Sequence, residues 1–472
     1  MIDEHVDGPE RLSDGREPLS DLPDVTQIGR DCEPLTGIGQ IGRQFLDEVR
    51  RAGKQRDAAP LGGELSSERF AESGADVTLF EAREDVGGRV RTRTVDGFTL
   101  DRGFQVLFGA YPAVKRELDL DALDLRRFDP GAVIARPGER STLADPLRSP
   151  GDAVESLFNR EVTVSDKLRT LALRQDLAGR TEAEIFARPD APIREYLRDW
   201  GFSPKYLRNF VAPFYGGITL DRSLSTSKRV FEYTFKALSD GQIAVPAAGM
   251  GAVPDQLAER AERAGASVRC SERVRSIEDA GDSVTVETDA ETLDADAVVV
   301  AADPKEARRL TDVESIPLEA RGCVTQYYRL PAEDAPKTGR KILLNAADPS
   351  PNTIVPMSEV APEYASDGTA LFNATFLGET ALDRDASALA EEARLTLESW
   401  YPERDFSALE PVRTHRIEFA QFDQPPGIHE SLPDVRAPGG STYLAGDYTA
   451  WSSIQGAMRS GREAARAVER DR

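Results

Sequence analysis

The sequence predicts an α/β fold with an α+β cap, in which a second domain is interleaved with the first and covers it. The chain has 472 residues, more than one small core accommodates. An apolar stretch at 77–80 ends on Glu81 and is followed by Gly87-Gly88-Arg89. A second stretch at 441–445 ends in Gly446-Asp447. Strands that lead into an acidic residue or a glycine turn are typical of dinucleotide-binding folds.

The first motif begins with the run Val77–Phe80, which is typical of a buried parallel strand. An acidic side chain at the tip of such a strand, here Glu81, is placed to accept both hydroxyls of an adenosine ribose. The glycines of Gly87-Gly88-Arg89 let the backbone approach a ligand, and the arginine suits a pyrophosphate. Residues 90–101 then form a predicted hairpin turned by Asp96-Gly97.

The order of this motif, followed by DRGFQV at 101–106, resembles the flavin-containing amine oxidase superfamily. That family includes phytoene and other carotenoid desaturases, protoporphyrinogen oxidases and amine oxidases. The resemblance implies a two-domain FAD-binding fold of the glutathione-reductase type, with a helical and antiparallel-sheet substrate domain. The FAD-binding residues that it implies here are Glu81, Ala82, Gly87, Gly88, Arg89, Gly103, Phe104, Gln105 and Val106.

The second motif is a strand that ends in Gly446-Asp447, followed by a helix that begins after a serine. It resembles the C-terminal flavin motif of the same superfamily. The resemblance implies that Asp447 binds the ribityl or pyrophosphate region and that Ile454-Gln455-Gly456 bring helix-start amides to the N1–C2=O edge of the flavin. A helix start there stabilises the reduced cofactor by about a kcal/mol. The backbone of Val274 is implied to meet the adenine.

Residues 1–60 are atypical and are expected to be poorly ordered. A flavoprotein of this type begins with an apolar strand and a glycine-rich turn. Counting back from Glu81, the three glycine positions fall on Ala58, Pro60 and Gly63, of which only Gly63 fits. The first strand and its turn are therefore predicted to be lost or scrambled, for example by a shifted reading frame or a wrong start. The pyrophosphate would then lose its main donors, and FAD binding would be weak or absent.

A literal G-x-G-x-x-G occurs at Gly37, Gly39 and Gly42. It lies far from Glu81, and no strand-like run precedes it, so we interpret it as a chance match. The alternative is a rearranged unit that uses this loop for the phosphates.

The patterns of apolar and charged residues divide the rest of the chain into two predicted domains. Residues 61–110, 245–310 and 435–470 are assigned to the FAD-binding domain, and 111–244 and 311–434 to the substrate domain. Helices are predicted at 165–177 and 193–202, and antiparallel strands at 324–328 and 370–376. The run 210–218, FVAPFYGGI, is read either as the wall of an apolar tunnel or as core packing between helices.

The net charge of −23 disfavours nucleic acid and anionic lipid as partners. It is interpreted as an adaptation to a high-salt cytoplasm. The three cysteines have no paired spacing, and no metal site is predicted. The chain lacks a run of about twenty apolar residues, which predicts a cytoplasmic protein. The lack of a membrane-spanning run is compatible with peripheral contact of the protein with a membrane.

The predicted function is an FAD-dependent oxidoreductase that removes a hydride from a hydrophobic substrate, such as an isoprenoid or carotenoid-like polyene. Two alternatives are an amine or protoporphyrinogen oxidase of the same family and a non-catalytic protein that has lost FAD. Many amine oxidases of the family carry a lysine where Cys323 stands and an aromatic residue where Ser453 stands, and both departures argue against amine oxidation. No catalytic base is assigned, and the electron acceptor is left open.

Overall fold

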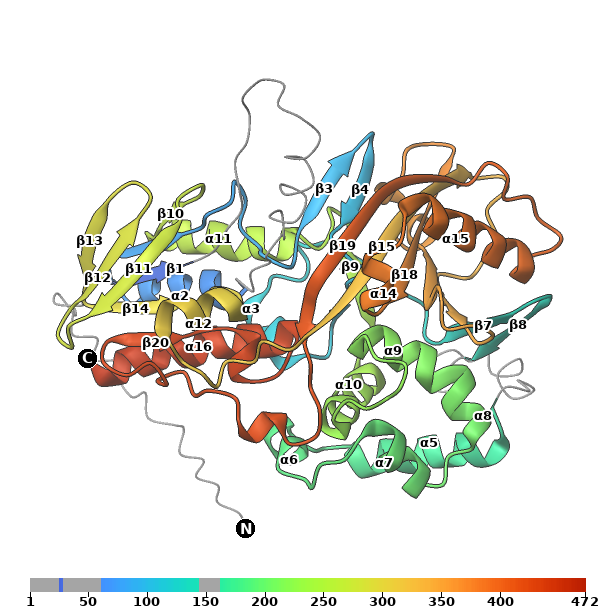
Figure 1. Cartoon of the computed structure of the whole chain (residues 1–472), viewed down its shortest axis with the longest axis horizontal. Coiled ribbons are helices and arrows are strands. Elements are labelled where there is room, and N and C mark those ends of the chain that lie inside the picture. Colours follow the sequence, from blue (N-terminus) through green and yellow to red (C-terminus); the bar gives the residue numbers. More distant parts are fainter. Residues whose placement is uncertain (1–24, 29–60, 144–161) are drawn as a thin grey trace, which may run out of the picture.

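The computed structural model describes residues 25–28, 61–143 and 162–472, which form two lobes side by side (Figure 1). The first lobe is built on a five-stranded sheet in the order β10-β2-β1-β14-β20, and each neighbouring pair is parallel. Its strands are β1 (Val25–Ile28), β2 (Val77–Phe80), β10 (Ser267–Arg269), β14 (Ala297–Val300) and β20 (Thr442–Leu444).

The central strand of this sheet is β1, which pairs with β2 on one side and with β14 on the other. The prediction that the first strand and its turn are lost or scrambled is therefore wrong for the strand, and the segment that follows β1 lies outside the described residues. The strand has the sequence VTQI, with only two apolar residues, so no apolar run marks it. Pairing with its neighbours, rather than its own composition, places it in the sheet. The predicted positions Ala58 and Pro60 and the literal glycine motif lie outside the described residues.

Helices α2 (Leu61–Glu72), α11 (Ala252–Ala264) and α16 (Ile454–Asp471) pack beside the parallel sheet. Helix α2 contacts both α11 and α16. A Cβ atom on Gly461 of α16 would lie 2.3 Å from the carbonyl oxygen of Gly62. Glycine at 461 therefore lets the last helix approach the start of α2 closely.

The hairpin predicted for residues 90–101 is confirmed, since β3 (Thr92–Val95) pairs antiparallel with β4 (Phe98–Asp101). Asp96 and Gly97 have φ angles of 51° and 82°, as a two-residue turn of this hand requires. A second antiparallel unit and a helix complete the lobe: β11 (Val274–Asp279), β12 (Val284–Thr288), β13 (Thr292–Ala295) and α12 (Pro304–Thr311).

The second lobe contains a seven-stranded sheet in the order β19-β15-β18-β17-β16-β7-β8. The predicted antiparallel strands are present, but β16 and β7 pair in parallel, so the sheet is mixed. Its strands are β7 (Ala132–Arg136), β8 (Glu139–Leu143), β15 (Ala320–Pro331), β16 (Ile342–Asn345), β17 (Thr353–Pro356), β18 (Thr369–Leu377) and β19 (Glu410–Phe422). Helices α13 (Met357–Val360), α14 (Glu379–Leu382) and α15 (Ala386–Trp400) accompany it.

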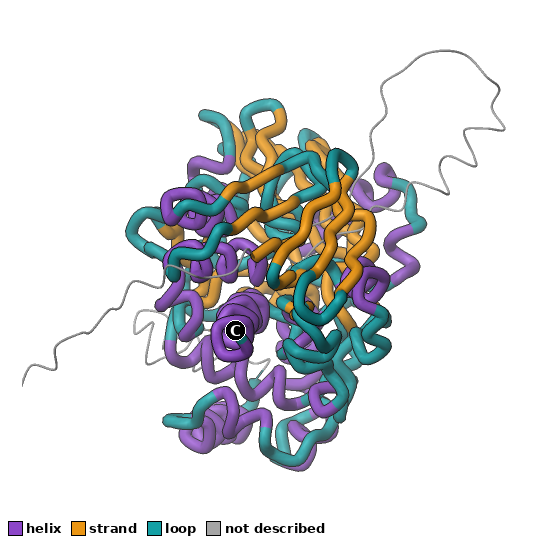
Figure 2. The backbone as a smooth tube through the Cα atoms, turned by 90° about the vertical axis from the view of Figure 1, so that its left-hand side faces the viewer, coloured by secondary structure: helices purple, strands orange, loops and turns teal. Residues whose placement is uncertain are grey.

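Helices below this sheet form the rest of the second lobe (Figure 1). They are α5 (Val164–Leu177), α6 (Glu182–Phe186), α7 (Ile193–Asp199), α8 (Pro204–Tyr206), the π-helix η2 (Leu207–Val211), α9 (Ala212–Thr219) and α10 (Lys228–Asp240). The predicted helices at 165–177 and 193–202 correspond to α5 and α7. Figure 2 shows most of the strands in the upper part of the molecule and most of the helices in the lower part.

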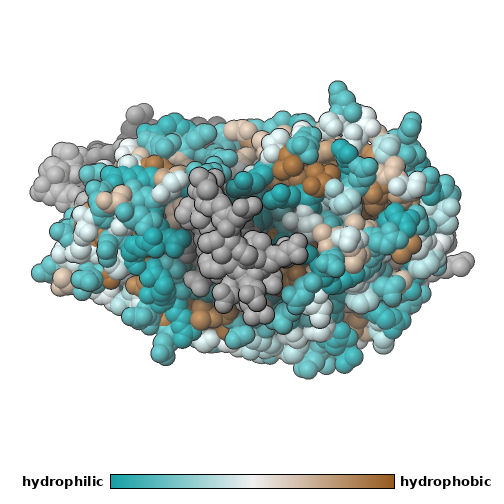
Figure 3. Space-filling model, turned by 45° about the horizontal axis from the view of Figure 1, so that its top comes forward, coloured by the Kyte–Doolittle hydropathy of each residue, from teal (hydrophilic) through white to brown (hydrophobic). Residues whose placement is uncertain are grey.

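The remaining elements are short. They are β5 (Leu107–Phe108), α3 (Pro112–Glu117), β6 (Leu125–Arg127), β9 (Ile243–Pro246), η3 (Pro362–Tyr364), η4 (Ile428–Glu430) and η5 (Asp447–Thr449). Of these, β5, β9 and β6 form a three-stranded sheet in the order β5-β9-β6. In the described ranges no helix is long and apolar enough to span a bilayer, and no cluster of metal-binding side chains occurs. The face seen in Figure 3 is mostly hydrophilic, with separate apolar patches.

Candidate active site

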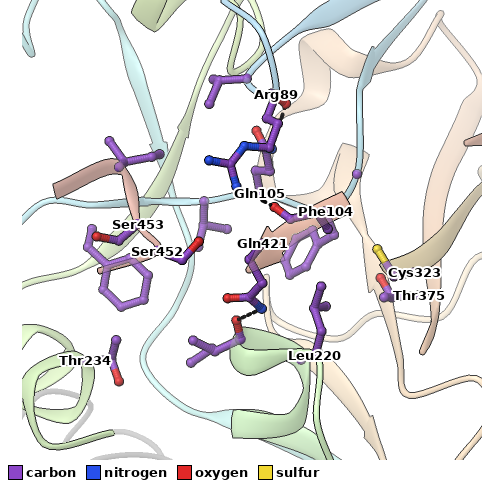
Figure 4. Close-up of a pocket in the computed structure, with 18 of the residues that line it drawn as sticks. Arg89, Phe104, Gln105, Leu220, Thr234, Cys323, Thr375, Gln421, Ser452 and Ser453 are labelled. Atoms are coloured by element: carbon purple, nitrogen blue, oxygen red, sulfur yellow. Dashed lines mark hydrogen bonds between the residues drawn. The ribbon is translucent and has the colours of Figure 1, made fainter. Parts of the chain in front are cut away.

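A cavity of about 270 Å³ lies where the two lobes meet. Its wall combines the segment after Gly87, the loop that follows β4, the start of α16, helices α9 and α10, and strands of the mixed sheet. Figure 4 shows Ser452 and Ser453 on one side of this space and Cys323 and Thr375 on the other. The cavity thus brings together the two motifs predicted from the ends of the sequence.

Arg89 and Asp447 form an ion pair in the cavity wall. Their N–O distance is 2.6 Å, and their side chains are only 11% and 3% exposed. Arg89 also donates to the carbonyl oxygen of Ala420 at 3.0 Å, and the Ser452 hydroxyl donates to Asp447 Oδ2 at 2.8 Å. The other oxygen, Oδ1, is buried without a hydrogen-bond partner among the described residues. A buried acceptor with spare capacity fits a ligand that carries hydroxyl groups.

The start of α16 faces the same cavity. Ser453 caps the helix by accepting the N–H of Gly456 at 2.8 Å, and Ile454 lies in the cavity wall. The side chain of Gln455 is bonded elsewhere, because its Oε1 accepts the N–H of Ala113 at 2.9 Å. A Cβ atom on Gly456 would lie 2.2 Å from the Trp451 carbonyl oxygen. These contacts hold the first turn in place and leave its positive dipole end at the cavity.

Glu81 directly follows β2, and its side chain is buried. Its Oε1 accepts the N–H of Arg83 at 2.9 Å. Glu81 and its neighbour Ala82 lie at the carboxyl end of a parallel strand, where ligands bind in folds of this class. Val274 is buried at the start of β11.

The structure places half of the predicted binding residues on the cavity wall. Those on the wall are Gly87, Arg89, Gly103, Phe104, Gln105, Val106, Asp447 and Ile454. Those that lie off the wall are Gly63, Glu81, Ala82, Gly88, Val274, Gly446, Gln455 and Gly456. Their roles stay predictions.

A buried carboxyl group, Glu64, lies in the first turn of α2 and escaped the sequence analysis. Its Oε1 accepts the N–H of Gly87 at 3.3 Å, and its Oε2 has no hydrogen-bond partner among the described residues. Burial raises the pKa of Glu64 well above its ordinary value, and the charges of Glu81 and Asp255 act in the same direction. An acidic residue is common in a first helical turn, so no local signal marks this one.

The sheet side of the cavity is formed by Cys323, Thr325, Thr353 and Thr375, with Arg102 nearby on the wall. Burial raises the pKa of the Cys323 thiol to about 12, so this group stays protonated at neutral pH. The remainder of the wall is largely aliphatic and aromatic.

The run 210–218 contributes Phe214, Gly217 and Ile218 to the wall. Phe210 instead stacks between Tyr206 and Phe214, with both ring centroids 5.4 Å away. Some residues of this run therefore line the cavity and others pack between helices, and the substrate tunnel stays a prediction.

Sequence reasoning missed the aromatic residues near the start of α16. Tyr111 and Trp451 line the cavity, and their ring centroids lie 6.0 Å apart. Tyr233 packs against both rings, at 5.9 Å from Tyr111 and 5.4 Å from Trp451. These residues are distant in sequence, and only the position of Trp451, inside the second motif between Asp447 and the start of α16, could have indicated the cavity.

Comparison with known proteins agrees with this geometry. The model of the family described as "Flavin containing amine oxidoreductase" matches residues 66–469. The chain is 23% identical to 15-cis-phytoene desaturase of Solanum lycopersicum over 449 residues, which cover 88% of this chain and 77% of the relative. It is 25% identical to carotenoid 3,4-desaturase of Haloarcula japonica over 282 residues, which cover 53% and 55%.

Solved structures show the same fold. An oxidoreductase from Methanosarcina mazei has a TM-score of 0.67 at 16% identity, covering 86% of this chain and 97% of that one. Cyclohexylamine oxidase from Brevibacterium oxydans has a TM-score of 0.65 at 16% identity, covering 95% and 100%. The α/β fold with its cap is thereby confirmed. The chain belongs to the flavin-containing amine oxidoreductase family and is an oxidoreductase.

Proposed function

We propose that this protein binds FAD along the Arg89–Asp447 side of the cavity and uses it to oxidise a hydrophobic substrate. The observation that carries the proposal is Oδ1 of Asp447, which has no hydrogen-bond partner in the part of the chain that the structure describes and is buried beside a guanidinium group and the start of α16. A carboxylate, a cation and helix-start amides together form a donor and acceptor set that suits a ribityl diphosphate. These residues therefore fit the flavin that the family implies.

The roles of the individual residues follow from their chemistry. Asp447 would accept hydroxyl groups, Arg89 would face the pyrophosphate, and Glu81 would hold the adenosine ribose. The loop at 103–106 would pass beside the flavin ring. When bound, FAD supplies the chemistry by accepting two electrons and a proton as a hydride.

The substrate class is inferred from the wall. Its aliphatic and aromatic members include Phe104, Phe108, Ile218, Leu220, Val230 and Leu238. Such a surface orients an apolar molecule and excludes water from it. We assign a polyene of the isoprenoid or carotenoid type, in line with the desaturases among the relatives. The electron acceptor is not assigned.

The ionisable groups of the wall support oxidation without a strong base. The wall holds no histidine and no lysine among the described residues. Burial keeps the Cys323 thiol protonated, with its pKa raised to about 12, and it raises the pKa of Tyr111 well above the ordinary value. Asp447 is engaged by Arg89. The protein's contribution is therefore mainly positioning in a dry site.

The test is anaerobic reduction of the FAD-loaded protein. We expect a detergent-solubilised polyene to bleach the visible flavin band, while benzylamine and a porphyrinogen leave it unchanged. The variant Leu238→Arg places a charge in the wall and should slow the bleaching at least about tenfold. Leu395→Arg is the matched control, because Leu395 is 50% exposed and lies off the cavity. Bleaching by benzylamine but not by the polyene would replace the proposal with amine oxidation.

A further inference from the structure

One acidic side chain of the helical region reaches across to the start of α16. Glu182 is the first residue of α6, and its side chain is only 12% exposed. Its Oε1 accepts the indole N–H of Trp451 at 3.1 Å and a hydrogen bond from Arg459. Its Oε2 accepts the side-chain amide of Gln455 at 2.9 Å. A single carboxylate thus accepts hydrogen bonds from three side chains within residues 451–459, around the start of α16.

The three hydrogen-bond partners of Glu182 lie at different positions around the start of α16. Trp451 is part of the cavity wall, Gln455 lies in the first turn of α16, and Arg459 lies one turn further on. The amide oxygen of Gln455 is also used, since it accepts the N–H of Ala113. Both the oxygen and the nitrogen of the Gln455 side-chain amide are therefore hydrogen-bonded.

We infer that Glu182 is a positioning residue, which fixes Trp451 and the first turn of α16 and so sets the shape of the flavin-binding end of the cavity. The inference rests on the proposed function only for the identity of the ligand. Burial and the nearby charge of Glu182 also raise the pKa of Tyr233, which packs against Trp451. The carboxylate is therefore surrounded by groups that line or support the wall.

A carboxylate is needed because both of its oxygens accept hydrogen bonds. Glutamine offers one acceptor oxygen and turns an NH₂ group toward a donor, so Glu182→Gln should retain part of the effect. Alanine removes all three contacts and leaves the donors of Trp451 and Gln455 unpaired. The matched control is Glu463→Gln. Glu463 is the second partner of Arg459, at 3.2 Å on the same helix, and is 44% exposed.

Two measurements test the inference. In the cofactor-free protein, hydrogen exchange of the amides at 451–460 should rise about tenfold in Glu182→Ala, less in Glu182→Gln, and not in Glu463→Gln. In the FAD-loaded protein, the dissociation constant for FAD should rise about tenfold in Glu182→Ala, with a shift of the visible flavin spectrum. If Glu182→Ala and Glu463→Gln behave alike in exchange, the inference is overturned.

Different results would reject the proposed FAD-dependent function and the inference that Glu182 positions the start of α16. If the unmodified protein binds no FAD, the proposed function is wrong, and exchange at 451–460 alone decides whether Glu182 positions this segment. If the unmodified protein binds FAD and Glu182→Ala exchanges faster but binds FAD equally well, Glu182 supports the helix without shaping the cofactor site, and the inference is rejected.

Discussion

Arg89 and Asp447 come from motifs near opposite ends of the sequence and meet in one buried ion pair, with an N–O distance of 2.6 Å. Neither motif alone makes a ligand site. Their meeting requires the parallel sheet to place the end of β2 and the end of β20 at the same edge, with β1 and β14 between them. The ion pair therefore forms only when the first lobe is correctly folded, and the candidate site depends on the same folding.

The first prediction concerns stability. Arg89→Ala leaves the carboxylate of Asp447 buried without a cation, with the Ser452 hydroxyl still donating to it, and we expect it to lower the free energy of unfolding by about 3 kcal/mol. The control is Arg329→Ala, which breaks an exposed pair with Glu410 whose side chains are 52% and 60% exposed. That loss should be below about 1 kcal/mol. Urea denaturation measures both, and equal losses would contradict the importance of the buried pair.

The second prediction concerns the cofactor. Asp447→Asn keeps the size of the side chain but removes its charge and one acceptor oxygen. We expect the dissociation constant for FAD to rise about tenfold or more. Titration followed by flavin fluorescence measures it. Asp423→Asn serves as control, since Asp423 pairs with Arg321 off the cavity wall, and an equal effect there would refute a specific role for Asp447.

The third prediction concerns Glu64. Because burial raises its pKa in the folded state above the value of about 4.5 expected when unfolded, the unfolded chain releases this proton at a lower pH. Stability therefore falls as pH rises from about 4.5 through the folded pKa. Glu64→Gln retains an oxygen for the N–H of Gly87 and removes this loss. We expect it to raise the melting temperature at about pH 8 and to have little effect near pH 4.

The same substitution should tighten FAD binding at neutral pH. It removes an acidic group that contacts the amide of Gly87, next to the position that the family resemblance implies for the pyrophosphate. The control is Glu72→Gln, at the other end of α2, whose side chain is 52% exposed. A Glu64→Gln protein with an unchanged pH profile of stability would contradict the burial argument.

The fourth prediction concerns acid sensitivity. Burial, with Arg102 and Arg413, lowers the pKa of His415 to about 4, and burial lowers that of His429 to about 4 despite Asp190. The unfolded chain then binds more protons between pH 6.5 and 4, so this stability is present above pH 6.5 and is lost as the pH falls. The loss should be on the order of 1–3 kcal/mol per histidine.

Replacing both residues with glutamine should flatten the stability profile in that window. Chemical denaturation at a series of pH values measures it. A loss confined to pH values below about 4 would instead indicate the carboxylates with lowered pKa, such as Asp166 and Asp221.

The sequence predicted what local patterns encode. The strand at 77–80, the turn at Asp96-Gly97 and the helix after Ser453 each have their own signal, and all three are present. Strand β1 was missed because VTQI has no apolar run and is separated from α2 by a long segment. Glu64 and Glu182 were missed because an acidic residue at a helix start is ordinary. Their importance comes from burial and from partners that only the tertiary fold supplies.

The content of bound flavin tests the central claim most directly. Protein purified without added cofactor, or reconstituted with excess FAD and then desalted, should carry one FAD per chain, measured as visible flavin absorbance against protein concentration. We expect this content to be lowered in Asp447→Asn and kept in Asp423→Asn. A colourless protein that does not retain FAD after reconstitution would contradict the account and favour a flavin-family fold that no longer binds its cofactor.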